Sequence, residues 1–177
     1  MRGGKTRRPP VRRPVAPEAG LHAAPPEEIV PATEAMLAAL LLAQAHTCTW
    51  SRTMMARPGL AAAMLQPPHR AGVMLRDGAP VVAIGVIQHW PGRAEAWLLA
   101  PEADRRDKVR ALRAARHWLD AAQTLPEWRR IEFYVIDGTP HGDWLRALGF
   151  EAEGRARCWA PDGRDATLFV RISGVTS

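Results

Sequence analysis

The sequence predicts a mixed α/β domain, in which a mostly antiparallel sheet contains one β–α–β crossover. Residues 71–100, AGVMLRDGAPVVAIGVIQHWPGRAEAWLLA, contain three strand-like runs in succession. A helical run follows at 105–123, and another strand-like run, RIEFYVI, at 130–136. Short turns join antiparallel strands, whereas a helical connection joins parallel ones. We therefore expect a sheet of about six or seven strands with one parallel pair.

The first elements are a short edge strand and a helix. EIVPAT at 28–33 predicts a strand that Pro31 stops, because proline is confined to the edges and ends of sheets. Thr33 is placed to cap a helix predicted at 34–46. A second helical segment, at 51–66, is broken near Pro58-Gly59.

Turn residues separate the later elements. Asp77-Gly78 predicts a two-residue hairpin, and Pro91-Gly92 predicts the turn before the third strand of 71–100. A short helix at 141–148 is expected to end at Gly149. The chain closes with a predicted hairpin of two strands, at 154–160 and 166–172.

The net positive charge is concentrated at the N-terminus. Lys and Arg exceed Asp and Glu by six, and residues 1–17 contain six basic side chains and no acid. These basic residues are Arg2, Lys5, Arg7, Arg8, Arg12 and Arg13. We expect residues 1–27 to form a disordered Arg- and Pro-rich tail. Two interpretations without a binding role are a solubilising extension and a start codon assigned too early; the functional interpretation is contact with nucleic acid without sequence preference.

Cysteine and hydropathy patterns narrow the class of protein. Cys48 and Cys158 show neither CxxC spacing nor nearby paired histidines, so we expect no metal site, no disulfide and two buried thiols. No apolar run follows the basic N-terminus, and no window approaches the roughly 20 apolar residues of a membrane span. The sequence thus predicts a soluble protein without a secretory signal.

Three stretches, in this order, resemble the GNAT superfamily of acyl-CoA-dependent N-acetyltransferases. IVPATEAMLAALL is similar to the first strand and helix of that family. RDGAPVVAIGVIQHWPGRAEAWLLAPE resembles its central antiparallel strands, which end at the splayed strand that binds pantetheine. IEFYVIDGTPHGDWLRALGFEAEGRARCWAPDG resembles its later strand, LGF helix end and terminal hairpin. The resemblance covers residues 28–172, leaves 173–177 as a C-terminal tail, and implies a central splayed parallel strand pair.

One motif of that family is missing. Its Arg/Gln-x-x-Gly-x-Gly/Ala loop binds the CoA pyrophosphate through backbone N–H groups at a helix N-terminus. Asp104, Asp107 and Val109 occupy the Arg/Gln position and the two Gly positions. Side chains would fill the space, and a like-charge contact at about 4 Å costs about 1 to 4 kcal/mol.

We therefore expect no cofactor, with acetyl-CoA as the alternative. If an acyl-CoA binds, the splayed strand and the basic first turn of the helix are expected to hold it. The residues concerned are Leu98, Leu99, Arg105, Arg106 and Lys108.

The catalytic groups that the resemblance implies are also incomplete. Leu145 stands where many members place a tyrosine that protonates the leaving thiolate, and the single tyrosine, Tyr134, lies within a strand. Glu95, on the strand before the splay, is a candidate general base; the alternative is an ordinary solvated acid, which is the commoner role of a carboxylate on a strand. Asp137 and His141 fall near the expected acceptor cleft, but their positions are those of turn and N-cap residues, which need no function, and we favour that interpretation.

A narrower resemblance is to a reduced, GNAT-like internal virion protein of short-tailed phages. APVVAIGV, AWLLAP, DKVRALRAARHWLD and HGDWLRALGF follow its progression of segments. This resemblance implies a catalytically degenerate protein of the virion or host cytoplasm that acts through contacts with virion or assembly proteins. The alternative is a working acetyl-CoA-dependent N-acetyltransferase with an atypical pyrophosphate loop.

The helix at 105–123 is amphipathic. Its apolar arc, expected to pack on the sheet, comprises Leu112, Ala115, Trp118, Leu119 and Ala122. The opposite side carries Arg106, Arg110, Arg113 and His117. This side is either a solvated face, partly paired by Asp120 with Arg113 or Arg116, or a basic stripe for a partner. We expect Trp97, Trp118 and Trp144 in the core, and the remaining tryptophans as interface anchors: Trp50, Trp90, Trp128 and Trp159.

Overall fold

The computed structural model describes residues 29–45, 59–67, 69–101, 103–124 and 128–173. Its elements, in chain order, are β1 (Ile29–Pro31), α1 (Glu34–Ala45), α3 (Leu60–Ala63), β2 (Arg70–Arg76), β3 (Ala79–Trp90), β4 (Arg93–Leu99), α4 (Arg105–Ala122), β5 (Arg130–Ile136), α5 (His141–Ala147), β6 (Glu151–Ala156) and β7 (Ala166–Ile172). The predicted N-terminal tail, Cys48 and Trp50 lie outside the described residues.

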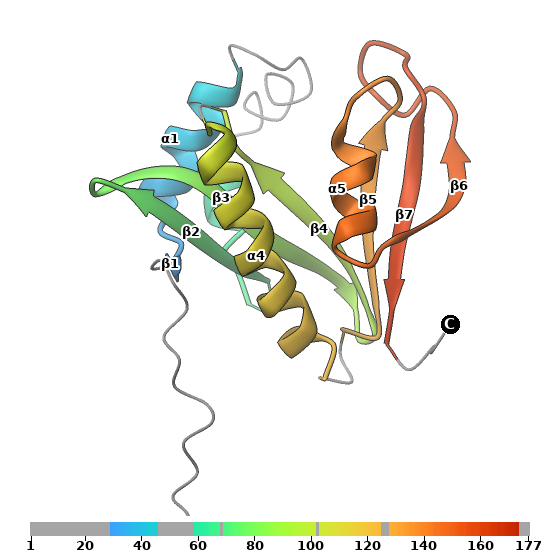
Figure 1. Ribbon diagram of the computed structural model, residues 1–177, viewed down its shortest axis with the longest axis horizontal. Coiled ribbons are helices and arrows are strands. Elements are labelled where there is room, and N and C mark those ends of the chain that lie inside the picture. The colour runs from blue at the N-terminus through green and yellow to red at the C-terminus, as the bar shows by residue number, and fades with distance from the viewer. Residues whose placement is uncertain (1–28, 46–58, 68, 102, 125–127, 174–177) are drawn as a thin grey trace, which may run out of the picture.

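The strands form one sheet in the order β1-β2-β3-β4-β5-β7-β6. β4 and β5 pair in parallel, and the other strand pairs of the described sheet are antiparallel, as the sequence predicted. The parallel ladder joins Arg93–Glu95 to Arg130–Glu132 and goes no further. Beyond it the two strands diverge, which Figure 1 shows as an opening between β4 and β5. The predicted splayed pair is thus confirmed.

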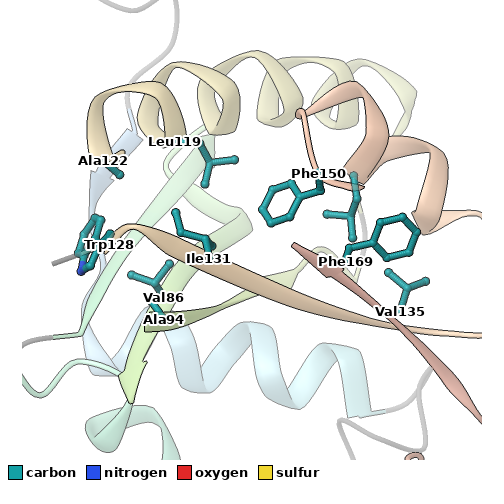
Figure 2. Close-up of a cluster of buried hydrophobic side chains, with 10 residues drawn as sticks. Val86, Ala94, Leu119, Ala122, Trp128, Ile131, Val135, Phe150 and Phe169 are labelled. Atoms are coloured by element: carbon teal, nitrogen blue, oxygen red, sulfur yellow. The ribbon is translucent and has the colours of Figure 1, made fainter. Parts of the chain in front are cut away.

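Helices cover both faces of the sheet. On one face, α1 and α3 pack against Val73, Ala83, Trp97 and Leu99. On the other, α4 and α5 pack over the core formed by Ile131, Val135, Phe150 and Phe169. Figure 2 shows Leu119 and Ala122 pointing from α4 onto this core. Side chains of successive strand residues alternate between the two faces, so that Ala94 faces α4 whereas Trp97 faces α1. Within the described ranges, no helix is long and apolar enough to cross a membrane.

Local turn chemistry explains the element boundaries. Asp77 and Gly78 both have positive φ, 52° and 78°, which is the geometry of a two-residue hairpin. Thr33 Oγ1 accepts the N–H of Met36 at 3.3 Å and so caps α1. Gly149 follows α5 with φ 81°, a left-handed conformation that glycine adopts without strain. These three predictions are confirmed.

The predicted closing hairpin was wrong in its first strand. β6 spans Glu151–Ala156 rather than 154–160, because Cys158 adopts φ 49° and donates its N–H to Asp165 Oδ1 at 2.8 Å. Cys158 is exposed, so the expectation of a buried thiol fails there. Trp128 is only 3% exposed and belongs to the core, not to an interface.

We predict that Gly85→Ala destabilises the protein. A Cβ at Gly85 would lie 2.4 Å from Trp97 Cζ2 and 2.6 Å from the carbonyl oxygen of Arg70. Overpacking of this kind costs about 1 to 3 kcal/mol in the free energy of unfolding, measurable by urea denaturation. Gly154→Ala is the matched control, since a Cβ there meets no atom within 4 Å. Equal stabilities of the two variants would contradict the close approach of Trp97.

Candidate active site

A cleft of about 550 Å³ opens where β4 and β5 diverge. Its walls come from both faces of the two strands and from the inner sides of α4 and α5. Apolar and aromatic side chains make up most of the lining. The ionisable, hydroxyl and amide side chains in it are Gln44, Glu95, Tyr134, Thr139, His141 and Arg164.

The divergence leaves the facing edges of two strands without a partner strand. From Glu95 and Glu132 onward, no described ladder joins β4 to β5. Backbone N–H and C=O groups along such edges are free to pair with an extended ligand, as they would with an added strand. The cleft therefore suits a narrow, extended molecule that contains amide groups.

A buried carboxylate holds the closed end of the cleft. The Glu132 side chain is 2% exposed and accepts two bonds from Arg93, at 2.8 and 2.6 Å, and one from Arg130 Nε at 2.5 Å. The bonds from Arg93, which contribute most, and the bond from Arg130 hold the pKa of Glu132 below its ordinary value. Arg93 also lies over the Trp90 ring, 4.4 Å from its centroid, and Arg130 pairs with Glu153. The sequence analysis did not identify this cluster.

Glu95 is the carboxylate of the cleft lining, and it lies beside the closed end. It is the register neighbour of Glu132 and its side chain is 33% exposed. A register shift at the end of β3, between Gln88 and Trp90, brings His89 within reach, and His89 Nε2 lies 3.1 Å from Glu95 Oε2. The structure thus places the predicted base in the cleft and adds a histidine that orients it.

His141 stands on the α5 side of the same cleft. Its Nδ1 lies 3.2 Å from Thr139 Oγ1. His141 is exposed as a residue, but partial desolvation of its ring, and then the positive charge of Lys108, lowers the pKa of His141 below the ordinary 6.5. Leu145, one turn later, is buried and cannot exchange a proton. Asp137 does not line the cleft; it accepts a bond from Thr167 at 2.8 Å and pairs with Arg155 at 3.2 Å.

Aromatic rings form much of the wall. Tyr134 stacks on Trp159 with ring centroids 5.0 Å apart, and both line the cleft. Trp97, Trp118 and Trp144 also line it. Trp97 belongs to the core and Trp118 packs against it, as the sequence predicted, whereas Trp144 is half-buried and lies outside the core clusters of the described residues. Trp97 is 8% exposed, and its Nε1 has no hydrogen-bond partner among the described residues. A buried donor of this kind suits a ligand acceptor.

The N-terminus of α4 is closed by its own side chains. Asp104 accepts the N–H of Asp107 at 2.8 Å, and Asp107 accepts the N–H of Asp104 at 3.3 Å, which is a reciprocal capping box. Arg76 Nη1 donates to Asp107 Oδ2 at 2.5 Å and to Asp104 Oδ2 at 3.4 Å. The hydrogen bond from the N–H of Asp107 makes the largest contribution to lowering the pKa of Asp104. The carboxylate of Asp104 therefore occupies an anion position at this helix end.

This arrangement corrects the sequence analysis. Both carboxylates were expected to face a phosphate, but Asp107 is 1% exposed and turned toward Arg76. Arg76 lies 31 residues earlier in the chain, at the end of β2, and no local pattern connects it with α4. The missing glycines are thus replaced by a cap that links α4 to β2.

The remaining candidate residues are dispersed. Leu98 lines the cleft, whereas Leu99 is 1% exposed and packs on the α1 face. Arg105, Arg106 and Lys108 are exposed on the first turn of α4. The basic residues proposed to contact nucleic acid, from Arg2 to Arg13, lie outside the described residues. In the part of the chain that the structure describes, no three His, Cys, Asp or Glu side chains form a metal-binding group.

Solved structures with the same fold are N-acetyltransferases. No protein-family model and no curated protein matches the sequence. Ribosomal-protein-alanine N-acetyltransferase from Brucella melitensis has a TM-score of 0.66 at 18% identity, over 82% of this chain and 99% of that one. RimL, a ribosomal L7/L12 α-N-protein acetyltransferase in complex with coenzyme A, has 0.65 at 12%, over 81% and 92%. The structure of yncA from Salmonella typhimurium with its cofactor acetyl-CoA has a TM-score of 0.65 at 12% identity, over 85% of this chain and 95% of that one. At such identities the likeness shows the GNAT fold.

We predict that Glu132→Gln removes part of the acid sensitivity of folding. Because the pKa of Glu132 is lowered in the folded protein, its ionic bonds stabilise the fold above the ordinary pKa of 4.5 and are lost as the pH falls through the folded value. At pH 7 the variant should lose about 2 kcal/mol of unfolding free energy. Below pH 4.5 its stability should fall less steeply than that of the parent protein.

Asp143→Asn is the control for this measurement. The Asp143 side chain is 87% exposed and pairs with Arg146 on the surface, so its loss should change stability little. Urea denaturation at a series of pH values tests both variants. An unchanged stability of Glu132→Gln at pH 7 would show that the cluster does not hold the closed end of the cleft.

Proposed function

We propose that this protein is an N-acyltransferase, which transfers an acyl group from a thioester on a pantetheine arm to an amine. The observation that carries the proposal is the cleft between β4 and β5, with Glu95 at one face and His141 at the other. A cleft that passes between two strands allows two substrates to approach from opposite faces of the sheet. The fold shared with N-acetyltransferases supports the same reading.

The residues of the cleft fit the arm of an acyl-CoA. A pantetheine arm is narrow and extended and carries two amide groups, which match the unpaired edges of β4 and β5. The apolar walls and the unpartnered N–H of Trp97 suit the same ligand. The N-terminus of α4 does not fit a pyrophosphate, because Asp104 occupies it. Acetyl-CoA would depend instead on the side chains of Arg105, Arg106 and Lys108.

The donor supplies an acyl carbon that is activated by its bond to sulfur. Glu95 Oε2 takes a proton from the acceptor amine, and the bond to His89 fixes the carboxylate in position for this step. The acceptor nitrogen then bonds to the acyl carbon as the carbon–sulfur bond breaks. The products are an amide and a free thiol.

The thiol needs a proton that Leu145 cannot supply. His141 lies one helical turn before Leu145 and is the titratable side chain of α5 that lines the cleft. Its imidazole relays a proton from solvent to the sulfur, with Thr139 holding Nδ1. His141 is exposed, so its imidazole can exchange this proton with solvent.

A second candidate is a non-catalytic protein that acts through contacts with virion or assembly proteins. The observation that favours it is the closed N-terminus of α4 together with Leu145 at the position of the family's proton donor. Exposed Trp90, at 55%, would serve as a contact residue on such a protein. In this candidate the cleft keeps the shape of the fold without its chemistry.

We predict that Glu95→Gln lowers the turnover of acyl transfer by about a hundredfold. The amide cannot accept the amine proton, whereas it keeps the size and the hydrogen-bonding position of the carboxylate. Thiol release from acetyl-CoA and from acetyl-pantetheine, in the presence of a polyamine or a peptide with a free N-terminus, measures the reaction. Asp143→Asn should retain full turnover, because its side chain is exposed and does not line the cleft.

Titration with acetyl-pantetheine separates the two candidates. We predict quenching of tryptophan fluorescence, because Trp97, Trp118, Trp144 and Trp159 line the cleft. Gly154 lies outside the cleft lining and a Cβ there meets no atom within 4 Å, so Gly154→Ala should leave the titration unchanged. A protein that shows neither quenching at millimolar ligand nor thiol release would be the non-catalytic one.

A further inference from the structure

We propose that the acyl donor of the cleft is an acidic carrier protein, which presents its acyl group on a 4′-phosphopantetheine arm and docks on the exposed arginines of α4. This inference rests on the proposed acyl transfer and names the donor that the site selects. Three observations carry it: the closed N-terminus of α4, the basic outer face of the same helix, and the position of that face beside the cleft.

The first observation concerns the phosphates that the site can accept. Asp104 accepts the N–H of Asp107 and is paired with Arg76, and the bonds lower the pKa of Asp104, so the carboxylate is ionised at neutral pH. A nucleotide donor would bring a pyrophosphate against this carboxylate. The arm of a carrier protein is attached through a single phosphodiester, which carries less charge and needs no set of N–H donors.

The second observation is the charge on the outer face of α4. Arg105, Arg106, Arg113 and Arg116 are exposed along the helix, and none forms an ion pair with a described residue. The sequence had suggested that Asp120, the acid on this face, pairs with Arg113 or Arg116. In the structure Asp120 is paired with Arg171 of β7. The outer face of α4 thus presents unneutralised positive charge, which complements an acidic partner.

The third observation joins this face to the cleft. Leu112, Ala115 and Leu119 line the cleft from α4, so one side of the helix is wall and the other is basic surface. Lys108 is exposed and stands one helical turn before Leu112, on the same side of α4, which places this lysine at the rim of the cleft. A phosphodiester bound at Lys108 would direct the arm into the cleft while its protein rests on the arginines.

A carrier protein accounts for more of the structure than a nucleic acid does. A nucleic acid would use the arginines and leave the apolar cleft empty. A carrier protein uses the arginines, the rim lysine and the cleft together.

The test compares four ligands with the full chain at moderate salt. The probes are a tryptophan-free bacterial acyl carrier protein acetylated on its arm, the same protein without the arm, acetyl-CoA, and a short DNA duplex. Tryptophan fluorescence reports entry into the cleft independently of activity. We expect the acetylated carrier to bind at least about tenfold more tightly than acetyl-CoA, and the armless carrier to bind without quenching.

Charge reversal on α4 tests the docking surface. Arg113→Glu and Arg116→Glu should each weaken carrier binding by about fivefold and leave the binding of acetyl-pantetheine unchanged. Glutamate favours the helix as arginine does, so folding should be retained. Arg129→Glu is the control, because Arg129 is exposed but lies after α4 and outside the cleft lining.

Asp104→Gly tests whether the closed N-terminus of α4 weakens the binding of acetyl-CoA. Glycine is also accepted at an N-cap position, so the helix should be retained, and the N–H of Asp107 is freed. We expect the variant to bind acetyl-CoA more tightly, by about tenfold, with carrier binding unchanged. Asp104→Asn keeps the cap without its charge and should give a smaller gain.

The outcomes separate this inference from the proposed function. If acetyl-CoA binds as tightly as the acetylated carrier, or if the arginine variants bind the carrier normally, the carrier proposal is wrong while acyl transfer stands. Arginine variants that weaken only the DNA complex would overturn it in favour of a nucleic-acid surface. If acetyl-pantetheine itself neither binds nor reacts, the proposed function fails as well.

Discussion

A three-residue ladder joins β4 to β5, and the ion pairs of Glu132 hold that ladder closed. Arg93 comes from one strand and Arg130 from the other, and both donate to the same buried carboxylate. A carboxylate taken out of water is stable only with such partners. Because the strands are fastened at one end alone, they can diverge at the other. The cleft, its apolar walls and its unpaired strand edges depend on this interaction.

The divergence of β4 and β5 also determines where the candidate reactive side chains lie. Side chains of β4 alternate between the two faces of the sheet, so Glu95 lies on the face of α1 while Ala96 and Leu98 line the side of α4. His141 approaches from α5. Glu95 and His141, to which the proposed function assigns the two proton transfers, therefore lie at opposite sides of one cleft. That separation suits a reaction in which one proton leaves the acceptor and another reaches the donor.

The first turn of α4 bears both on the stability of the helix and on the ligands that its N-terminus can bind. Its capping box and the pairing of Asp107 with Arg76 satisfy N–H groups that would otherwise bind an anion. The helix gains a fixed start and a link to β2, while Asp104 occupies the position that a pyrophosphate would need. In the proposal above, the exposed arginines and the rim of the cleft then select the acyl donor.

The sequence by itself determined the elements and much of the topology. Hydrophobic period, the Asp77-Gly78 turn, the Thr33 cap and Gly149 each act within a few residues, so helices, strands and the single parallel pair were predictable, and Glu95 was placed on the correct strand. Only the tertiary structure decided the partners of the buried charges. Arg76 bonds to Asp107, which lies 31 residues later in the chain, and Arg93 bonds to Glu132, which lies 39 residues later. His89 reaches Glu95 through a register shift, and Trp128 is buried by α4. Such contacts depend on strand register and on which helix covers which edge, and these follow from packing of the whole chain and not from any local pattern.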